Sequence, residues 1–381
     1  MRIEQTKWTP EAGWLPQHPG ELRGAADLAL VFAGRHVLSD TSVLADVQDK
    51  YPGARVFGCS TAGEICDTAV RDDSAVVTVV NFESSRVEYS LAHVNESANS
   101  LDLGKRLAQG LPSEGLVHVF VLSDGLKVNG SELVKGMAEH LQPDVSVTGG
   151  LSGDGGSFEE TSVVFDGQAA PGTVAALGLY GKDLRIGFAS LGGWDPFGPE
   201  RLITRSEGNV LYELDGRSAL DLYKTYLGEH AKGLPATGLL FPLSLRIEEG
   251  ATPVVRTILG IDEAEQSMTF AGDVPTGAYA RLMKANFDRL IDGAVGAAKA
   301  CHEIVGASSP DLAILISCVG RKMVLKQRTE EEVEGVREVL GPDTTLTGFY
   351  SYGEISPFTP NAKCELHNQT MTITTISERA A

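Results

Sequence analysis

The sequence predicts a mixed α/β fold, with two intertwined domains whose mixed β-sheets are flanked by helices. Three observations support this prediction. Short apolar runs alternate with amphipathic stretches, as strands alternate with helices in α/β proteins. A coarse pattern that reads strand, helix, short strand, glycine-rich acidic turn, strand occurs three times. The length of 381 residues is enough for two or three domains and a sizeable core.

Strands are predicted where short apolar or β-branched runs lie between turn residues, and helices where apolar residues recur at helical spacing. In chain order, the strands are Leu28–Phe32, Arg55–Phe57, Ala75–Asn81, Val87–Val94, Val117–Leu122, Ser162–Phe165, Thr173–Tyr180, Leu184–Ser190, Pro253–Ile261, Leu312–Cys318 and Thr370–Ile376. The helices are Asp40–Lys50, Ser100–Gly110, Ser131–Leu141, Arg217–Leu227, Asn286–Val305 and Glu330–Leu340. Asp40 and Asn129 stand at N-cap positions, where their side chains can accept hydrogen bonds from free N–H groups.

Each copy of the repeated pattern has a first and a last strand. These pairs are Leu28–Phe32 with Ala75–Asn81, Val117–Leu122 with Ser162–Phe165, and Leu312–Cys318 with Thr370–Ile376. Between them, a glycine follows the short strand, then a small or hydroxyl residue, then a glycine next to an acid. Residue identity between the copies is low, so duplication is a hypothesis based on these shared features.

The middle of the chain is rich in glycine and proline. The stretch Gly192–Pro199 predicts a surface crossover or an inter-domain linker. We therefore expect one domain over residues 1–195 and a second over 196–381, with a ligand pocket between them, because clefts between domains are common ligand sites.

The composition excludes several classes of function. A formal net charge of -19 argues against nucleic acid or an anionic membrane as the main partner, because both attract clustered Lys and Arg. No apolar run approaches the roughly 18 residues of a membrane helix, and the start does not resemble a signal peptide, so we expect a cytoplasmic protein. The five cysteines form no C-x-x-C pair, which argues against a disulfide framework or a zinc knuckle.

The densest candidate for a binding site is Gly58–Glu64, which includes Cys59 and Gly63. Its glycines let backbone N–H groups turn toward one point, while Ser60 and Thr61 offer hydroxyls and Glu64 a carboxylate. Together these groups suit a small molecule that carries both a negative group and an ammonium. The alternative is a tight turn with a solvated glutamate.

A second candidate is Phe349–Pro357, in which Tyr350 and Tyr352 occupy alternate positions and precede Glu354. In a strand, the two tyrosines face the same side and form half of a cage for a cationic group. The alternative is that this face packs in the core and the tyrosines supply apolar area.

The third glycine-rich turn, Gly149–Gly156, contains Gly150 and Asp154 but lacks the G-K-[ST] ending of a P-loop and the Rossmann fingerprint. If the three turns converge, Glu64, Asp154 and Glu354 meet and suit an amine or a divalent metal. Three unrelated exposed turns are the alternative, so the sequence leaves a metal site undecided.

Two other groups of residues are weaker candidates. Arg321 follows a predicted buried strand and can clamp a carboxylate with two hydrogen bonds, although a structural ion pair is the more ordinary interpretation. The eight histidines show no metal-binding spacing, and a single histidine is more often structural than an axial haem ligand. No nucleophilic triad stands out, since Ser60 does not lie in a G-x-S-x-G motif.

Six segments resemble landmarks of the FIST family of intracellular signal-transduction proteins, in the family's order and over nearly the whole chain. They are Val56–Ile65 and Gly149–Gly155 of the N-terminal domain, and Leu214–Tyr223, Cys318–Arg321, Gly348–Ile355 and Leu366–Thr370 of the C-terminal domain. The resemblance implies a FIST N-terminal domain over 1–195 and a FIST C-terminal domain over 196–381. It assigns no catalytic residue.

The resemblance also implies a function in sensing. FIST proteins are proposed to sense small ligands such as amino acids upstream of kinases and cyclic-di-nucleotide enzymes, and some bacterial members are described as haem-binding nitric-oxide sensors. This chain carries no recognisable kinase, cyclase or F-box segment, so we expect its output to pass through a separate partner.

Four hypotheses follow from these observations. The first is a small-molecule sensor, not an enzyme and without a cofactor, whose ligand lies among Ser60, Thr61, Glu64, Asp154, Tyr352 and Glu354. The second is a haem-based gas sensor. The third is an enzyme that uses Cys59 or Ser60 as nucleophile, and the fourth is an interaction scaffold. The identity of the ligand and the oligomeric state stay open.

Overall fold

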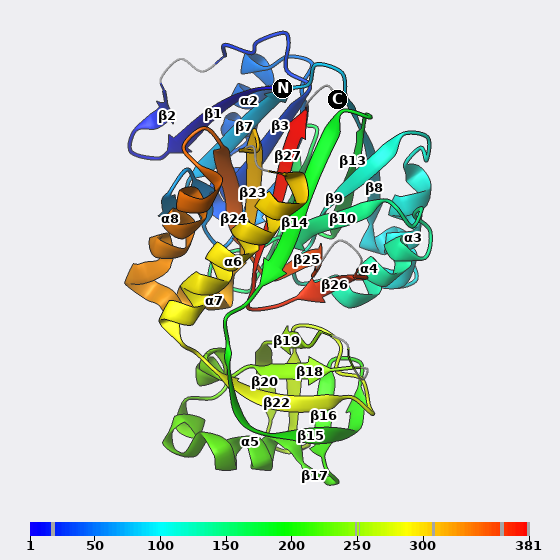
Figure 1. Ribbon diagram of the computed structural model, residues 1–381, viewed down its shortest axis with the longest axis vertical. Coiled ribbons are helices and arrows are strands. Elements are labelled where there is room, and N and C mark those ends of the chain that lie inside the picture. Colours follow the sequence, from blue (N-terminus) through cyan, green and yellow to red (C-terminus); the bar gives the residue numbers. More distant parts are fainter. Residues whose placement is uncertain (17–19, 248–249, 251, 307–308, 359–361, 379–381) are drawn as a thin grey trace.

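The structure is a computed structural model that describes residues 1–16, 20–247, 250, 252–306, 309–358 and 362–378. Figure 1 shows a large α/β body built from both ends of the chain and a smaller, β-rich body built from its middle. The predicted class, mixed α/β with mixed sheets and repeated units, is therefore confirmed.

Three sheets of the large body share one plan, in which a central strand lies parallel to one neighbour and antiparallel to the other. The three sets are β3 (Leu28–Gly34) between β4 (Arg55–Thr61) and β7 (Ala75–Asn81), β9 (Leu116–Ser123) between β10 (Ser146–Leu151) and β13 (Thr173–Tyr180), and β23 (Leu312–Cys318) between β24 (Thr345–Ser351) and β27 (Met371–Glu378). The three copies expected from the sequence are thus three structural units.

The units are interlocked because each passes one strand to the next. The strand β5 (Glu64–Cys66) leaves the first unit and pairs with β24, β25 (Gly353–Pro357) leaves the third and pairs with β10, and β11 (Val163–Phe165) leaves the second and pairs with β4. This exchange corrects one prediction. The last strand of the second unit is β13, and not Ser162–Phe165, because β11 belongs to the neighbouring sheet.

One glycine in each unit is fixed by this packing. Gly58, Gly149 and Gly348 lie opposite Val31, Val121 and Leu315 in the parallel pairs. A Cβ atom at these glycines would lie 1.8, 1.8 and 1.9 Å from the carbonyl oxygen of the opposite residue, so only glycine fits. The shared glycine in the repeated pattern is therefore a packing requirement.

Apolar side chains from all three sheets fill the space between them. Phe32 and Phe349 have ring centroids 4.8 Å apart, and those of Phe57 and Phe120 are 6.2 Å apart. Burying one such ring contributes about 1.5–3 kcal/mol, so this common core holds the three units as one body.

Helices cover the sheets on the outside (Figure 1). They are α1 (Arg35–Ser39), α2 (Thr41–Lys50), α3 (Ser100–Gly110), α4 (Gly130–Ala138), α6 (Phe287–Val305), α7 (Val319–Leu325) and α8 (Thr329–Leu340). Both predicted caps are confirmed, since Asp40 accepts from the Ser42 N–H and Asn129 from those of Ser131 and Glu132. Within the described part of the chain, no helix is long and apolar enough to cross a membrane.

Further strands complete the sheets of the large body. They are β1 (Arg2–Thr9), β2 (Gly13–Leu15), β6 (Ala69–Arg71), β8 (Arg86–His93), β12 (Gln168–Ala170), β14 (Leu184–Leu191) and β26 (Cys364–His367).

The small body is an eight-stranded antiparallel sheet with its own apolar core. Its elements are β15 (Asp195–Glu207), β16 (Val210–Leu214), β17 (Arg217–Ser218), α5 (Ala219–Leu227), β18 (Leu243–Arg246), β19 (Val254–Arg256), β20 (Ile258–Asp262), β21 (Ser267–Phe270) and β22 (Tyr279–Lys284). Two predictions are corrected here. The expected linker Gly192–Pro199 becomes strand from Asp195 onward, and Pro253–Ile261 divides into β19 and β20.

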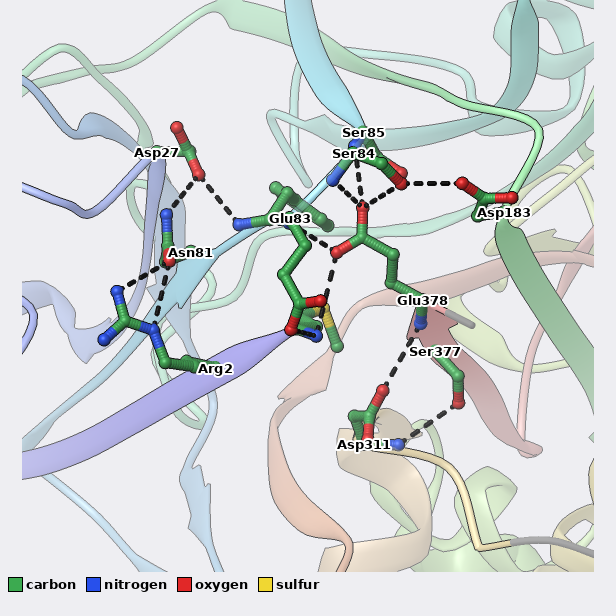
Figure 2. Close-up of polar contacts among 12 residues, drawn as sticks. Arg2, Asp27, Asn81, Glu83, Ser84, Ser85, Asp183, Asp311, Ser377 and Glu378 are labelled. Carbon is green, nitrogen blue, oxygen red and sulfur yellow. Dashed lines mark hydrogen bonds and ion pairs between the residues drawn. The ribbon is translucent and has the colours of Figure 1, made fainter. Parts of the chain in front are cut away.

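Glu378, the last described residue of the chain, is held by hydrogen bonds at one edge of the large body (Figure 2). The carboxylate of Glu378 accepts hydrogen bonds from the N–H groups of Glu83, Ser84 and Ser85, at 2.5, 2.8 and 2.7 Å. Burial alone would raise the pKa of Glu378, but these bonds hold it at about 2. The ionised carboxylate thus fastens β27 to the turn between β7 and β8.

Candidate functional site

A cavity lined by charged residues, here called the polar cavity, lies where the parallel strands β3 and β4 end and where β23, which is parallel to β24, ends. The carboxyl ends of parallel strands are the usual location of ligand sites in α/β sheets. The volume of the polar cavity is about 470 Å³. The lining residues are Gly34–His36, Thr61–Glu64, Asp72, Asp73, Asp154–Ser157, Val319, Lys322, Met323, Lys326 and Thr329. The two halves of the chain therefore both contribute to this cavity.

Acidic and basic side chains both line the polar cavity. The basic ones are Arg35, His36, Lys322 and Lys326, and the acidic ones are Glu64, Asp72, Asp73 and Asp154. A ligand with one positive and one negative group can therefore find a complement for each, whereas a large apolar ligand cannot.

Glu64 is the most buried acid of this cavity, with 1% of its surface exposed. One carboxylate oxygen accepts from the Thr61 hydroxyl, and the other from the Ser74 N–H at 3.0 Å and hydroxyl at 2.6 Å. Burial raises the pKa of Glu64 to about 7, although the hydrogen bonds from Ser74 and Thr61 oppose the shift. The carboxyl group is therefore fixed in place and can exchange its proton near neutral pH.

Lys322 of α7 supplies an ammonium to the same cavity. Its Nζ donates to the Ala62 carbonyl oxygen at 2.9 Å, forms an ion pair with Asp72, and lies 5.5 Å from the ring centroid of Tyr350. Gly63, with a φ of +135°, makes room for this ammonium, since a Cβ there would lie 2.4 Å from Nζ.

Asp154 organises the loop on the opposite wall. It accepts hydrogen bonds from the N–H groups of Phe158, Glu159 and Glu160 at 2.8 to 3.0 Å, and from the hydroxyl of Tyr352. Burial opposes ionisation, yet these bonds lower the pKa of Asp154. The anionic carboxylate thus holds the loop in one shape.

The structure places the eleven site residues expected from the sequence in different surroundings. Four of them, Thr61, Gly63, Glu64 and Asp154, line the polar cavity. The other seven, Cys59, Ser60, Gly150, Arg321, Tyr350, Tyr352 and Glu354, do not line it.

The residues that precede Thr61 are packed inside. Cys59 and Ser60 are both 0% exposed, and the Ser60 hydroxyl accepts from the Ser162 N–H. Burial, together with the nearby Glu64, raises the pKa of the Cys59 thiol, so neither side chain is placed to act as a nucleophile. Gly150 allows close packing, because a Cβ there would lie 2.9 Å from Ile316.

Arg321 and Tyr350 belong to a buried network around Glu332. The Arg321 guanidinium pairs with Glu332 at 2.6 Å and also donates to the carbonyl oxygens of Gly192 and Leu290. The Tyr350 hydroxyl donates to Glu332 at 2.6 Å. The structural ion pair considered in the sequence analysis is therefore the observed arrangement, and the carboxylate clamp and tyrosine cage are not formed.

Convergence of the three acids is only partial. Glu64 and Asp154 line one cavity, but Glu354 is 0% exposed and bonds to Ser351 and Thr370. Within the described residues, no group of three or more His, Cys, Asp or Glu could hold a metal ion.

The sequence analysis missed the basic side chains of the polar cavity. Arg35 bonds to Glu159 at 2.9 Å and to Asp154 at 3.4 Å. Its position directly after β3, at the carboxyl end of a parallel strand, was a usable signal. Lys322 was not predicted, and its neighbour Arg321 was. The two side chains point in different directions from α7, so Lys322 lines the cavity while Arg321 is buried.

A second, apolar cavity, here called the seam cavity, lies between the two bodies and has a volume of about 780 Å³. It is lined by residues from 125–130, 233–236, 257–259, 270–272 and 318–320, with Leu151, Phe158, Asn209, Leu239, Met323 and Tyr352.

Neither cavity fits a histidine-ligated haem. Haem needs an apolar slot and an axial ligand. The polar cavity contains His36 but is highly charged, and no histidine lines the seam cavity, all of whose lining residues are described. Among the buried histidines, His118 already bonds to Ser146 and Thr148, and His367 to the Ser356 carbonyl. His18 lies outside the described residues.

Comparisons with known proteins place the chain in a family. The FIST N domain matches residues 27–217 and the FIST C domain matches residues 219–357. An uncharacterized protein of Methanocaldococcus jannaschii is 22% identical over 343 residues, which are 80% of this chain but only 64% of that protein. Uncharacterized proteins of two Mycobacterium tuberculosis strains are 24% identical over 354 residues, which are 88% of this chain and 88% of each of those proteins.

Among solved structures, the cyanuric acid hydrolase from A. caulinodans aligns with 100% of this chain and 99% of its own, at a TM-score of 0.37 and 9% identity. A likeness at that level carries no inference about activity. The two domain matches together cover most of the sequence. The chain therefore belongs to the FIST family, whose domains are sensory domains of signal transduction.

Proposed function

We propose that the protein is a sensory module that binds a small zwitterion or amine, such as a free amino acid, in the polar cavity. The observation that carries the proposal is the presence of four acidic and four basic side chains around a cavity of about 470 Å³. That volume lies within the range of roughly 300–1,000 Å³ typical of small-molecule sites.

The two charges of such a ligand have distinct partners. Its ammonium meets Glu64, whose carboxylate is already oriented by Thr61 and Ser74. Its carboxylate meets Lys322 and Arg35, which stand on other walls. Because Glu64 has a pKa of about 7, an approaching cation favours loss of its proton.

The output of the proposed sensor is the loop 154–160. Arg35 ties this loop to the cavity through Asp154 and Glu159, and Glu159 is exposed on the surface. A ligand carboxylate that draws Arg35 away loosens the loop, and a separate signalling protein, such as a kinase or a cyclic-di-nucleotide enzyme, reads the change.

The test is a thermal melt of the purified protein against amino acids, amines, divalent metals and haemin. A ligand at 100 times its Kd adds about 2.7 kcal/mol to native-state stability. At this chain length that corresponds to a rise in Tm of several degrees, by rough scaling. We expect a selective rise with one amino acid or amine, and its loss in Glu64→Gln. A rise with haemin alone, or no rise with any compound, would contradict the proposal.

A further inference from the structure

The seam cavity is lined by residues of both bodies of the protein. The large body contributes the loop 125–130 and the start of α7, and the small body contributes residues 233–239 and parts of β20 and β21. Two hydrogen bonds join the two bodies beside the seam cavity. Arg256 Nη1 donates to the Leu366 carbonyl oxygen and Asn129 Nδ2 donates to Asp273, both at 2.9 Å. Any molecule in this cavity therefore touches both bodies at once.

The chemistry of the seam cavity is opposite to that of the polar cavity. Its walls consist mainly of Leu, Ile, Val, Phe, Met and Ala side chains. Lys127 is the one charged residue among its lining residues, and no carboxylate lines it. An amino acid or amine that suits the polar cavity finds no counter-charge for its ammonium here, whereas an apolar molecule is favoured by burial of its surface.

Large apolar side chains at this cavity are left in contact with solvent. Leu126, Phe158 and Leu259 are 39%, 45% and 50% exposed, and all three line the cavity. Exposed apolar surface gathered around one hollow is typical of a binding site, because a bound molecule removes that surface from water.

The cavity also offers one buried polar group without a partner. Thr257 is 5% exposed, and its hydroxyl makes no hydrogen bond with any described residue. Buried hydroxyls are normally paired, and Thr257 is an exception among the residues that line this cavity. Thr257 can donate to a carbonyl or hydroxyl oxygen, and the exposed Lys127 can pair with one negative group.

We infer that the seam cavity is a second ligand site, which takes a compact apolar or aromatic molecule that is neutral or carries one negative group. Binding there bridges the two bodies. The site is separate from the amino-acid site proposed above, because the two cavities share only Val319 and Met323 in their linings.

Two fluorescent probes with the same anilinonaphthalene skeleton test the inference. N-phenyl-1-naphthylamine is neutral, and 1-anilinonaphthalene-8-sulfonate carries one negative charge. We expect saturable binding of both to the folded full chain with one site per chain. Leu259→Trp places a larger side chain in the cavity and should weaken the binding of both probes at least tenfold. The control Leu91→Trp changes a leucine of equal exposure, 51%, on β8 and should change neither affinity more than twofold.

Further variants separate the contributions. Ala236→Trp, at another lining position, gives a second filled cavity if Leu259→Trp is unstable in a thermal melt. Lys127→Met should weaken only the sulfonated probe, and Glu64→Gln should affect neither. Absence of saturable binding, or unchanged affinities in both filled variants, would overturn the inference whether or not the polar cavity binds amino acids.

Discussion

Glu64 and Glu354 occupy the same position in two of the three units, and their surroundings differ in one respect. Each accepts a hydrogen bond from a hydroxyl three residues earlier, Thr61 or Ser351. Each also accepts two bonds from a residue just before the last strand of its unit, Ser74 or Thr370. Glu64 lines the polar cavity, whereas Glu354 is 0% exposed and does not line it.

The difference lies in the two residues that precede Ser74 in the first unit and Thr370 in the third. In the first unit they are Asp72 and Asp73, which are exposed, and in the third they are Asn368 and Gln369, which are 0% exposed. The amide side chains of the third unit are buried, whereas the aspartates of the first unit line the polar cavity. The same turn is therefore enclosed by the protein in the third unit and lines a cavity in the first.

The largest expected effect concerns the shared framework. Gly58→Ala and Gly348→Ala each push a Cβ into a backbone carbonyl of the adjacent strand. Each change should cost more than about 4 kcal/mol or prevent folding, which is at the upper end for single substitutions. Urea unfolding measures this loss. A loss below about 1 kcal/mol in one variant alone would show that the two units are not built alike.

A smaller effect is expected from removing a hydroxyl that supports each carboxyl group. Ser74→Ala and Thr370→Val should each destabilise the protein by about 1–3 kcal/mol, because a buried carboxyl group loses a partner. Chemical unfolding at pH 8 gives both values. Only Ser74→Ala should also change ligand affinity, and an equal change in both variants would contradict the division of roles.

The pH dependence of stability distinguishes the two glutamates. Burial raises the pKa of Glu64 to about 7 and that of Glu354 to about 8. Between the unfolded-state pKa of about 4.3 and these values, the native state holds a proton that the unfolded state has lost, so stability falls as pH rises.

Replacing either glutamate with glutamine removes its part of this decline. Glu354→Gln should flatten the stability curve up to about pH 8, and Glu64→Gln only up to about pH 7. Unfolding free energies measured from pH 5 to 9 check this. If the free energy of unfolding of the wild-type protein rose with pH over this window, after correction for the titration of other groups, the raised pKa values of the two glutamates would be contradicted.

The smallest effect is expected at Asp72, an exposed residue that lines the polar cavity. Asp72→Asn removes the partner of Lys322 in an exposed ion pair, where Asp72 is 66% exposed. Stability should change by less than about 1 kcal/mol. Affinity for an amino acid should change only a few-fold, as measured by calorimetry. A loss of affinity as large as that expected for Glu64→Gln would show that Asp72, and not Glu64, binds the ammonium of the ligand.

Much of the fold could be predicted because its elements have strong local signals. Ala75–Asn81, Thr173–Tyr180 and Leu312–Cys318 were predicted with their observed bounds, since each is a continuous buried run. The exchanged strands could not be assigned, because β5 and β11 are three residues long and pair with distant segments. The strand β15 was missed because most of its residues are exposed or half-buried, which hides the apolar alternation.

The site was only partly predictable for a related reason. A glycine next to an acid in the sequence predicts the path of the backbone, and this pattern occurs at both Glu64 and Glu354. Whether the acid meets a cavity also depends on Lys322 and Asp154, which come from the other two units. The seam cavity had no sequence signal, since its walls join two bodies that are distant along the chain.

The central claim is that Glu64 receives the ligand's ammonium while Glu354 only supports the fold. The most direct test is calorimetry of the amino acid or amine found by thermal melting, at pH 6.5 in two buffers of different ionisation enthalpy. The account predicts that binding releases most of one proton in the wild-type protein and in Glu354→Gln, because the ligand ionises Glu64. Glu64→Gln should bind at least tenfold more weakly and release none. Equal weakening in the two variants, or unchanged proton release in Glu64→Gln, would contradict the claim.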